Sequence, residues 1–371
     1  MNNFHMREGK VEFRWKRWRN KKRQEVSSCL MVLFSGAVLL GAGGVALAGP
    51  TGGQITGGTG TITTPDGTTT NINQQSNVLN INWQDFSIGA GETVNFYQPG
   101  ATSIAINRVV GGVPSYLAGA LNANGRVFIL NSAGITFTGT SQVNVGALLA
   151  TTAMTVNGDP TQAASYSGSG YGAVINQGSI SVSNGGFAIL AAPYVQNTGF
   201  IKADLGTIAL AGTNQFTLDL SGTGLINFVV PASAVEKIVS DGKAVGVDNS
   251  GTLQARSGQV VISANVASEV VNAVVNLNGI VDADAFAANG QGGAVLVTAA
   301  GDINVGGQVT AKGSGAGAGG QIVTKAGGAD AIGALAYVSA AGGAAGGKGG
   351  FIGVSGKQVG LAGNIDPGKG G

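Results

Sequence analysis

The chain has 371 residues, of which 66 are Gly and only 10% are charged, and its formal net charge is +2. An average soluble protein holds about 7% Gly and about 25% charged residues, so an ordinary mixed globular domain is a poor fit. With eight Pro residues and no three-residue Gly period, collagen is excluded, and the many Val and Ile residues argue against disorder. This composition is typical of a solenoid with stacked aliphatic residues inside and Gly and Asn at its corners.

Residues 1–48 have the pattern of a secretory signal peptide with a long basic n-region. Nine Lys/Arg and three Glu lie within residues 7–25, and the uncharged apolar run 28–48 ends in Ala46-Leu47-Ala48. This order predicts cleavage after Ala48, so that the mature chain begins at Gly49. The run is also long enough to be an uncleaved membrane anchor, but the small residues at 41–44 favour cleavage. A nucleic-acid-binding arm is a third reading, which the direct junction with the apolar run disfavours.

Removal of residues 1–48 changes the charge and the available chemistry. Residues 49–371 hold 11 Lys/Arg and 15 Asp/Glu, a net charge of −4, so no basic surface for nucleic acid remains. Cys29 and His5 are the only residues of their types, and both lie before the predicted cleavage site. The mature chain therefore has no Ser/His/Asp or Cys/His nucleophile arrangement and none of the usual zinc ligand sets.

The stretch from Asn82 to Thr152 alternates short apolar segments with Gly, Asn and Ser turns, which predicts strands and turns. This stretch contains several short motifs in sequence: Asn82-Trp83-Gln84 with Phe86, the run Ile88 to Phe96, Asn107-Arg108-Val109 with Gly111, Pro114-Ser115, Gly119, and Asn124 to Phe128. On these residues the stretch resembles the amino-terminal secretion domain of the filamentous-haemagglutinin family, the large exoproteins of two-partner secretion in Gram-negative bacteria. The resemblance is strong from about residue 50 to about residue 230.

This resemblance implies an all-β fold, a right-handed parallel β-helix with a capped amino-terminal secretion domain. It also implies export to the cell surface or the medium through an outer-membrane transporter, whose periplasmic domains bind the secretion domain before it has folded. The secretion motif would comprise Asn107, Arg108, Asn131, Ser132, Ala133, Gly134 and Ile135. Where the family usually has Asn-Pro-Asn-Gly-Ile, this chain has Asn131-Ser132-Ala133-Gly134-Ile135, and Gly134 keeps the positive φ position of the turn.

Downstream, two short patterns repeat. Asn-x-Gly-x-apolar occurs at Asn176–Ile180, Asn197–Ile201 and Asn249–Leu253, with a shortened copy at Asn278–Ile280; Gly-x-apolar-x-apolar occurs at Gly186–Leu190, Gly206–Leu210 and Gly258–Ile262. The interval from Gly178 to Gly199 predicts the length of one coil. Apolar positions two apart predict short strands with one face inward, and Asn and Gly are expected to supply left-handed conformations at the corners.

We therefore expect a signal peptide over residues 1–48, a secretion domain over 49–230 and continuing Gly/Ala-rich β-helix repeats over 231–371. Two segments interrupt the pattern. Residues 159–172 are predicted to form a surface loop, and residues 231–247 have a spacing compatible with a short helix or a strand pair. No set of barrel strands ending in an aromatic residue is present, so we expect no transporter domain, and either a truncation or a short natural exoprotein.

One carboxylate pair, Asp282 and Asp284, is a candidate for chemistry because residues two apart on a strand share a face. By analogy of fold alone, polysaccharide-degrading β-helix enzymes use such carboxylates for acid/base catalysis or Ca²⁺ binding. No third acid, Arg or Lys clusters with the pair in the sequence, which favours a solvated face or a coil corner. Arg108 and Arg126 could steer an acidic partner or pack at the end of the rod.

The function hypothesis is a non-enzymatic secreted adhesin rod with no catalytic, cofactor-binding or metal-binding residues. Its predicted partners are the transporter and a host-cell or surface glycan receptor, with no nucleic acid. A secreted polysaccharide-active enzyme, a lyase or glycosidase on the same scaffold, is the alternative. The first rests on the motifs between Asn82 and Thr152, and the second on the Asp282 and Asp284 pair.

Overall fold

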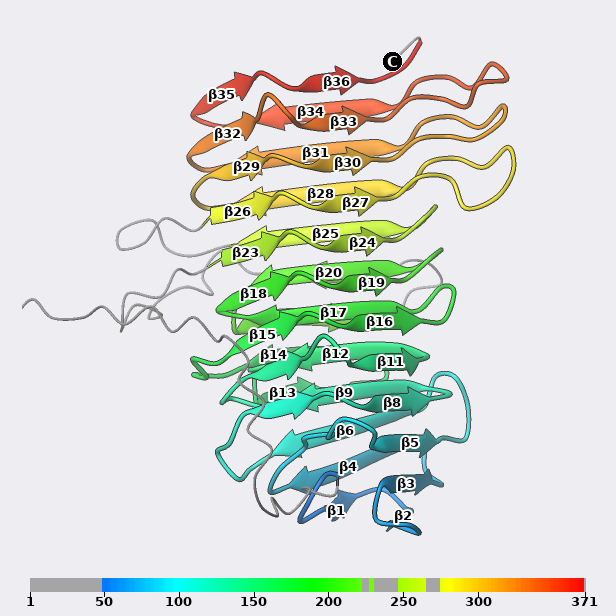
Figure 1. Ribbon diagram of the computed structural model, residues 1–371, viewed down its shortest axis with the longest axis vertical. Coiled ribbons are helices and arrows are strands. Elements are labelled where there is room, and N and C mark those ends of the chain that lie inside the picture. Colours follow the sequence, from blue (N-terminus) through cyan, green and yellow to red (C-terminus); the bar gives the residue numbers. More distant parts are fainter. Residues whose placement is uncertain (1–48, 222–226, 230–245, 265–273, 370–371) are drawn as a thin grey trace, which may run out of the picture. The chain divides into compact units, whose positions relative to one another are not determined.

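Three parallel sheets wind around one aliphatic interior, and each coil from β6 onward adds a strand to each sheet. The computed structural model describes residues 49–221, 227–229, 246–264 and 274–369, which all belong to one compact unit, Ala46–Gly371. Within those ranges every regular element is a strand. Figure 1 shows the coils stacked from the blue strands β1 and β2 to the red strand β36. The predicted all-β class and the parallel β-helix are confirmed.

Strands that are neighbours in a sheet come from successive coils. Sheet I runs β1 (Gln54–Gly57), β4 (Val78–Trp83), β6 (Ile104–Val109), β9 (Arg126–Leu130), β12 (Ala147–Thr151), β17 (Phe187–Ala192), β20 (Thr207–Gly212), β25 (Gln259–Ala264), β28 (Ala294–Ala299), β31 (Gln321–Ala326) and β34 (Phe351–Ser355). Sheet II runs β7 (Ser115–Leu117), β10 (Ile135–Phe137), β15 (Ala173–Asn176), β18 (Tyr194–Asn197), β23 (Gly246–Asn249), β26 (Val274–Leu277), β29 (Ile303–Val305), β32 (Ala329–Ile332) and β35 (Gln358–Leu361).

Sheet III runs β2 (Gly60–Thr63), β3 (Thr69–Gln74), β5 (Thr93–Tyr97), β8 (Ala120–Ala123), β11 (Gln142–Val145), β16 (Ser179–Val182), β19 (Phe200–Lys202), β24 (Thr252–Gln254), β27 (Ile280–Asp282), β30 (Gln308–Thr310), β33 (Tyr337–Ser339) and β36 (Asn364–Asp366). Sheet IV lies outside the coils and is antiparallel, with β13 (Thr155–Gly158), β14 (Ala163–Ser167), β21 (Gln215–Asp219) and β22 (Asn227–Val229).

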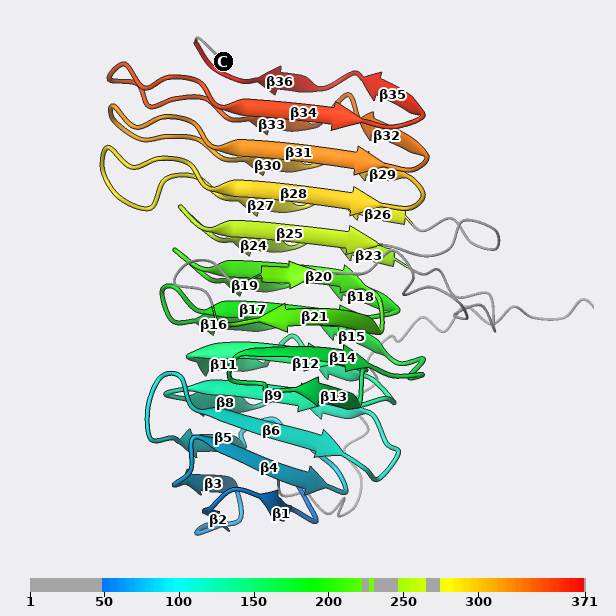
Figure 2. The same cartoon turned by 180° about the vertical axis from the view of Figure 1, so that it is seen from behind.

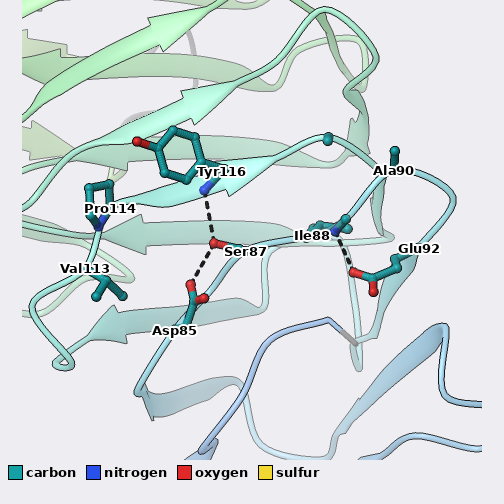
Figure 3. Close-up of a pocket in the computed structure, with 10 residues that line it drawn as sticks. Asp85, Ser87, Ile88, Ala90, Glu92, Val113, Pro114 and Tyr116 are labelled. Carbon is teal, nitrogen blue, oxygen red and sulfur yellow. Dashed lines mark hydrogen bonds between the residues drawn. The ribbon is translucent and has the colours of Figure 1, made fainter. Parts of the chain in front are cut away.

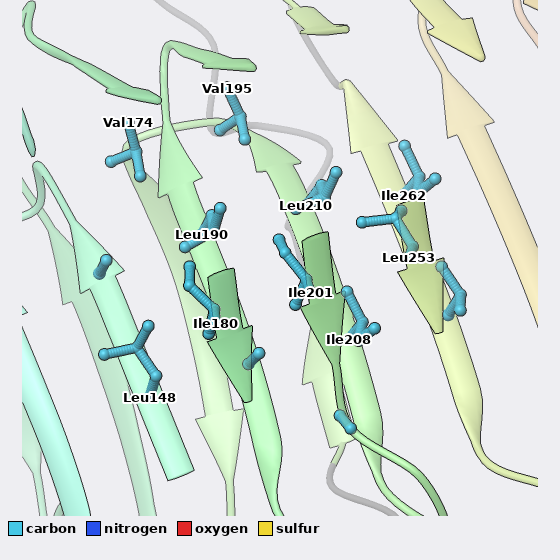
Figure 4. Packing of buried hydrophobic residues seen from close by; sticks show 14 of the residues in the cluster. Leu148, Val174, Ile180, Leu190, Val195, Ile201, Ile208, Leu210, Leu253 and Ile262 are labelled. Carbon is cyan, nitrogen blue, oxygen red and sulfur yellow. The ribbon is translucent and has the colours of Figure 1, made fainter. Parts of the chain in front are cut away.

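The interior consists of columns of aliphatic side chains in register from coil to coil. In sheet III, Ile180 pairs with Ile201 and Ile201 with Leu253, and each is fully buried. Figure 4 shows these side chains facing Leu190 and Leu210 of sheet I across the interior. Each coil thus covers the apolar face of the previous one, which is why a single coil is not stable alone.

The first coils are closed by antiparallel strands. β1 pairs antiparallel with β4, and β2 pairs antiparallel with β3, whereas the later strands of sheets I and III run parallel. The exposed edge of the first parallel coil is therefore covered, which is a common protection against edge-to-edge pairing. This arrangement is the predicted amino-terminal cap (Figure 2).

The expected reason for the repeated Gly residues was wrong. Gly178, Gly199 and Gly251 do not have φ in the left-handed region. Instead, a Cβ on Gly199 would overlap the carbonyl oxygen of Gly178, and one on Gly251 would overlap that of Gly199. The corners stack so closely that only Gly fits, a steric requirement distinct from a turn conformation.

The repeated Asn residues also have a different role from the expected one. Asn176, Asn197 and Asn249 are fully buried and form a ladder across sheet II. Asn176 Nδ2 donates to Asn197 Oδ1 at 2.7 Å, and Asn197 Nδ2 donates to Asn249 Oδ1 at 2.7 Å. In register, Phe137 precedes the ladder and Leu277 follows it. We name these three residues the asparagine ladder.

The prediction of one uniform coil length is only partly correct. In sheet I, Leu148 pairs with Val127, which is the interval expected from Gly178 and Gly199. Val260, in contrast, pairs with Ile208, because a long excursion leaves and rejoins the coil between them. Strand patterns after Lys312 are confirmed in β31 and β34.

The predicted surface loop at 159–172 was wrong. Its middle is β14, which pairs with β13 and β21 in sheet IV. Tyr166 is fully buried and stacks on Phe216 with ring centroids 4.9 Å apart. Only two inward residues, Ala164 and Tyr166, alternate in this strand, which is too short a pattern to recognise. Most of segment 231–247 lies outside the described residues, which resume at β23.

Candidate functional site: the first coils and their cap

Asn107 of the predicted secretion motif is a fully buried residue of β6. Its Oδ1 accepts a hydrogen bond from Trp83 Nε1 at 2.9 Å. Its Nδ2 lies 3.3 Å from the carbonyl oxygens of Ala105 and Phe128. Since buried amides are costly unless paired, Asn107 fixes the Trp83 indole within the folded domain.

Arg108 and Arg126 are half-buried in sheet I. Arg108 Nη1 lies 3.4 Å from Asn80 Oδ1, and burial lowers the pKa of Arg108. The guanidinium carbon of Arg126 lies 5.9 Å from the ring centroid of Phe187, and burial also lowers the pKa of Arg126. These contacts match a packing role for both Arg residues and not the steering of an acidic partner.

Asn131 organises the turn that leads into β10. Its Nδ2 donates to the Val113 carbonyl oxygen and to Ser115 Oγ, both at 2.9 Å, and its Oδ1 accepts from the Ala133 amide at 3.0 Å. Asn131 is therefore buried and bonded to the preceding coil. The Pro-free turn keeps its shape through these contacts.

The rest of the turn is equally well fixed. Gly134 has φ of 114°, as predicted, and a Cβ there would lie 3.0 Å from the Ala173 carbonyl oxygen. Ile135 is buried in the interior, while Ser132 and Ala133 are partly exposed. In the folded domain, the turn is thus joined to the coils on both sides.

A pocket of about 530 Å³ lies next to this turn, between residues 85–92 and 113–118. Figure 3 shows Asp85, Ser87 and Tyr116 on its wall, with Ser87 Oγ donating to Asp85 Oδ1 at 2.7 Å and accepting from the Tyr116 amide at 3.1 Å. Tyr116 is 55% exposed. Because Asn131 also holds the Val113 carbonyl, the motif supports one side of the pocket. Sequence reasoning did not find this pocket, since its walls come from separate coils.

The candidate carboxylate pair has structural partners. Asp282 Oδ1 accepts from the Asp284 amide at 2.9 Å, and burial raises the pKa of Asp282. Asp284 forms an ion pair with Lys312 at 3.3 Å and accepts from the Lys312 amide at 2.6 Å. In the part of the chain that the structure describes, no group of three or more His, Cys, Asp or Glu residues could hold a metal ion.

The sequence did not reveal a second acidic position two coils earlier. Asp204 is fully buried and accepts from Arg256 Nη2 at 2.7 Å and Nε at 3.1 Å. Burial favours a higher pKa for Asp204, but the hydrogen bonds from Arg256 and Gln254 outweigh it and hold the pKa below the ordinary value. This bidentate pair joins the segments that follow β19 and β24, as Asp284 and Lys312 do after β27 and β30.

Of the predicted cleavage residues, Ala46 and Ala48 lie outside the described residues. Gly49 is described and buried. Across the described ranges, no helix is long and apolar enough to cross a membrane.

The chain is similar in sequence to curated proteins and similar in fold to solved structures. A heme/hemopexin-binding protein of Haemophilus influenzae (strain ATCC 51907 / DSM 11121 / KW20 / Rd) is 31% identical over 231 residues, which cover 59% of this chain and 25% of that protein. Another heme/hemopexin-binding protein of Haemophilus influenzae is 43% identical over 81 residues, or 22% of this chain and 9% of that protein. The chain thus spans about a quarter or less of the length of these curated relatives.

Among solved structures, the HMW1 secretion domain from Haemophilus influenzae superposes with a TM-score of 0.71 at 22% identity, covering 86% of this chain and 84% of that one. The filamentous hemagglutinin secretion domain gives a TM-score of 0.42 at 15% identity, covering 86% and 99%. The HMW1 likeness supports the β-helix fold. Residues 48–311 match the family model of the TPS secretion domain, and the chain therefore belongs to this family, the secreted exoproteins that two-partner secretion exports through the outer membrane.

Proposed function

We propose that the turn from Asn131 to Ile135, together with Asn107 and Arg108, is read by the periplasmic domains of the partner transporter before the domain folds. The supporting observation is burial: Asn107 and Asn131 are at most 1% exposed once the coils have formed. A side chain that is buried in the folded domain is available to a partner only in the unfolded chain. Recognition of an extended segment by strand addition is a general mode for such an encounter.

Folding outside the cell then supplies the driving force for export. Each new coil buries its aliphatic column on the previous one, and the cap provides the first surface for this stacking. No nucleotide-binding motif occurs in the sequence. The signal peptide at residues 1–48, cleaved after Ala48, delivers the chain to the periplasm in this proposal.

The exported rod acts as a surface adhesin that binds a host-cell protein or glycan. The curated relatives are named heme/hemopexin-binding proteins, which supports a binding function and makes a heme-carrying host protein one candidate ligand class. The engagement of Asp284 by Lys312 favours a structural role for the carboxylate pair over a polysaccharide-active enzyme. We therefore propose that the exoprotein is not an enzyme.

The test combines a secretion assay with a binding assay. The variant Asn131→Ile with Gly134→Val removes the amide contacts and the positive φ position, and we expect it to block release of the exoprotein into the medium when the transporter is co-expressed. Gly139→Val is the matched control because Gly139 is exposed and nothing lies within 4 Å of its Cβ position. The control should be secreted normally.

Binding separates recognition from folding. Both variants are held unfolded in mild denaturant and titrated with the isolated periplasmic domains of the transporter. The proposal predicts weaker binding of the double variant than of the control. Lost secretion with unchanged binding would assign the turn to folding instead, and normal secretion would remove it from the export mechanism.

A further inference from the structure

Glu92 is a buried carboxylate that forms no ion pair with a Lys or Arg side chain among the described residues. It is 6% exposed and lies at the start of the segment that leads into β5. A carboxylate removed from water is costly unless a charge or several hydrogen bonds compensate it.

The groups that do face Glu92 are backbone amides. Its Oε2 accepts from the Gly89 amide at 2.5 Å and from the nitrogen of Gly49 at 2.9 Å. Figure 3 shows the carboxylate turned toward the backbone at residues 88–89. Gly49 is itself buried and lies far from Glu92 in the sequence.

Gly49 lies where the backbone closely approaches the Thr70 side chain. Its φ is 57°, and a Cβ there would lie 2.9 Å from Thr70 Oγ1. Shortly after it, Thr51 forms a bridge with Asp85, and the Gln84 amide donates to the Thr51 carbonyl oxygen at 3.0 Å. These contacts hold the segment that begins at Gly49 in place, so that its first nitrogen faces Glu92.

Gly49 is also the residue that the predicted cleavage makes the first of the mature chain. Hydrolysis of the Ala48–Gly49 peptide bond consumes one water, leaving a carboxylate on Ala48 and an amine on Gly49. The amine takes up a proton at neutral pH, since a free α-amino group has a pKa of about 7.7 to 8.0. The amide donor that faces Glu92 then becomes an ammonium.

We infer that signal-peptide cleavage completes the fold by creating the missing cation: the α-ammonium of Gly49 pairs with the buried carboxylate of Glu92 and fastens the cap to the first coil. We call this pair the amino-terminal latch. A charge-assisted hydrogen bond is roughly twice as strong as a neutral one, so the cleaved chain holds its cap more firmly than the precursor. Processing in the periplasm thereby supplies the ammonium that fastens the cap when the domain folds outside the cell. The latch rests on the cleavage site proposed above.

Four proteins test the latch: chains that begin at Gly49 or retain Leu47 and Ala48, each with Glu92 or with Glu92→Gln. The chains are released from a fusion by a protease that leaves no residue of its own. Because the Gly49 nitrogen donates as an amide as well, the extension keeps the hydrogen bond and moves the positive charge away from Glu92, to the α-amino group of Leu47. We expect trimming to Gly49 to lower the unfolding equilibrium constant at least tenfold with Glu92, and to have no effect with Glu92→Gln.

Hydrogen exchange of the Thr51 and Gln84 amides gives a local readout, since their bonds hold this segment. Exchange should slow on trimming only when Glu92 is present. Nα-acetylation of the chain that begins at Gly49 provides a test without a mutation and should reverse the gain. Equal effects of trimming in both backgrounds, or none with Glu92, would overturn the latch.

Sequencing the amino terminus of the secreted protein separates the two proposals. A secreted chain that starts at a residue other than Gly49 overturns both the cleavage site and the latch in the native exoprotein. A start at Gly49 without coupling to Glu92 overturns the latch alone and leaves the cleavage site intact.

Discussion

The asparagine ladder makes a position-dependent prediction for substitution by Leu. Asn197 both accepts from Asn176 and donates to Asn249, whereas each end residue makes one ladder bond. Asn176 Oδ1 has no hydrogen-bond partner among the described residues. The size of Leu is tolerated in this column, because Leu277 occupies the next position in register.

The magnitude follows from the groups left unpaired. Asn197→Leu removes two bonds and leaves the Asn249 Oδ1 without its ladder donor and the Asn176 Nδ2 with only contacts of 3.4 Å and 3.5 Å to carbonyl oxygens. Each buried unpaired group costs about 1 to 3 kcal/mol. The apolar gain from Leu is common to all three positions, so Asn197→Leu should cost about 1 to 3 kcal/mol more than either end substitution.

The triple substitution to Leu is the sharpest comparison, because it leaves no ladder amide without a partner. Replacing all partners of a buried network by apolar groups is often nearly neutral. Urea unfolding of the chain that starts at Gly49 measures all four variants. Equal losses at Asn176, Asn197 and Asn249, or a triple variant with the summed loss of the three, would refute the ladder as described.

Three further outcomes can be measured on the same protein. Gly206→Ala should destabilise it by about 2 kcal/mol or more, because the Cβ would overlap the carbonyl of the preceding coil, while Gly139→Ala should change the urea midpoint little; equal midpoints would contradict the stacking argument. The pKa of Asp204 is lowered on folding, so its pairing with Arg256 stabilises the fold above the unfolded pKa of about 3.9 and is lost as pH falls through the folded pKa. Asp204→Asn should therefore lower the urea midpoint at pH 7 and lose this effect in acid; a midpoint loss that does not change with pH would contradict the ion pair. Tyr166→Phe should be neutral or stabilising by up to about 1 kcal/mol, since the buried hydroxyl has no partner among the described residues; a clear loss in the midpoint would show that it has one.

The repeat pattern was visible in the sequence, but its physical meaning was not. Asn197 and Gly199 were recognised as a corner, and the corner exists. Local chemistry suggested a left-handed turn, whereas the structure shows an interior hydrogen bond and a close approach of two backbones. Both are contacts between coils, and a single coil does not reveal which residues of the next coil lie beside it.

Contacts between distant parts of the sequence were missed for the same reason. Tyr166 and Phe216 stack in sheet IV although two coils of the solenoid lie between them in the chain. In the sequence, Gly49 is part of the predicted cleavage site and Glu92 lies within the family motif, but their pairing requires the cap to be in place. The secretion-domain motif between Asn82 and Thr152, by contrast, is contiguous, and it predicted the fold correctly.

Two polar contacts span the same step of the solenoid. Asn197 to Asn249 and Asp204 to Arg256 both cross the excursion between β20 and β25, the longest interval between paired coils in the described part of the chain. Aliphatic columns alone fix the inward face but allow a coil to slip by two residues along a strand. A buried amide pair and a bidentate ion pair do not tolerate that slip, because each would leave its partner unpaired. We infer that these contacts restore the register where the chain returns from its longest departure.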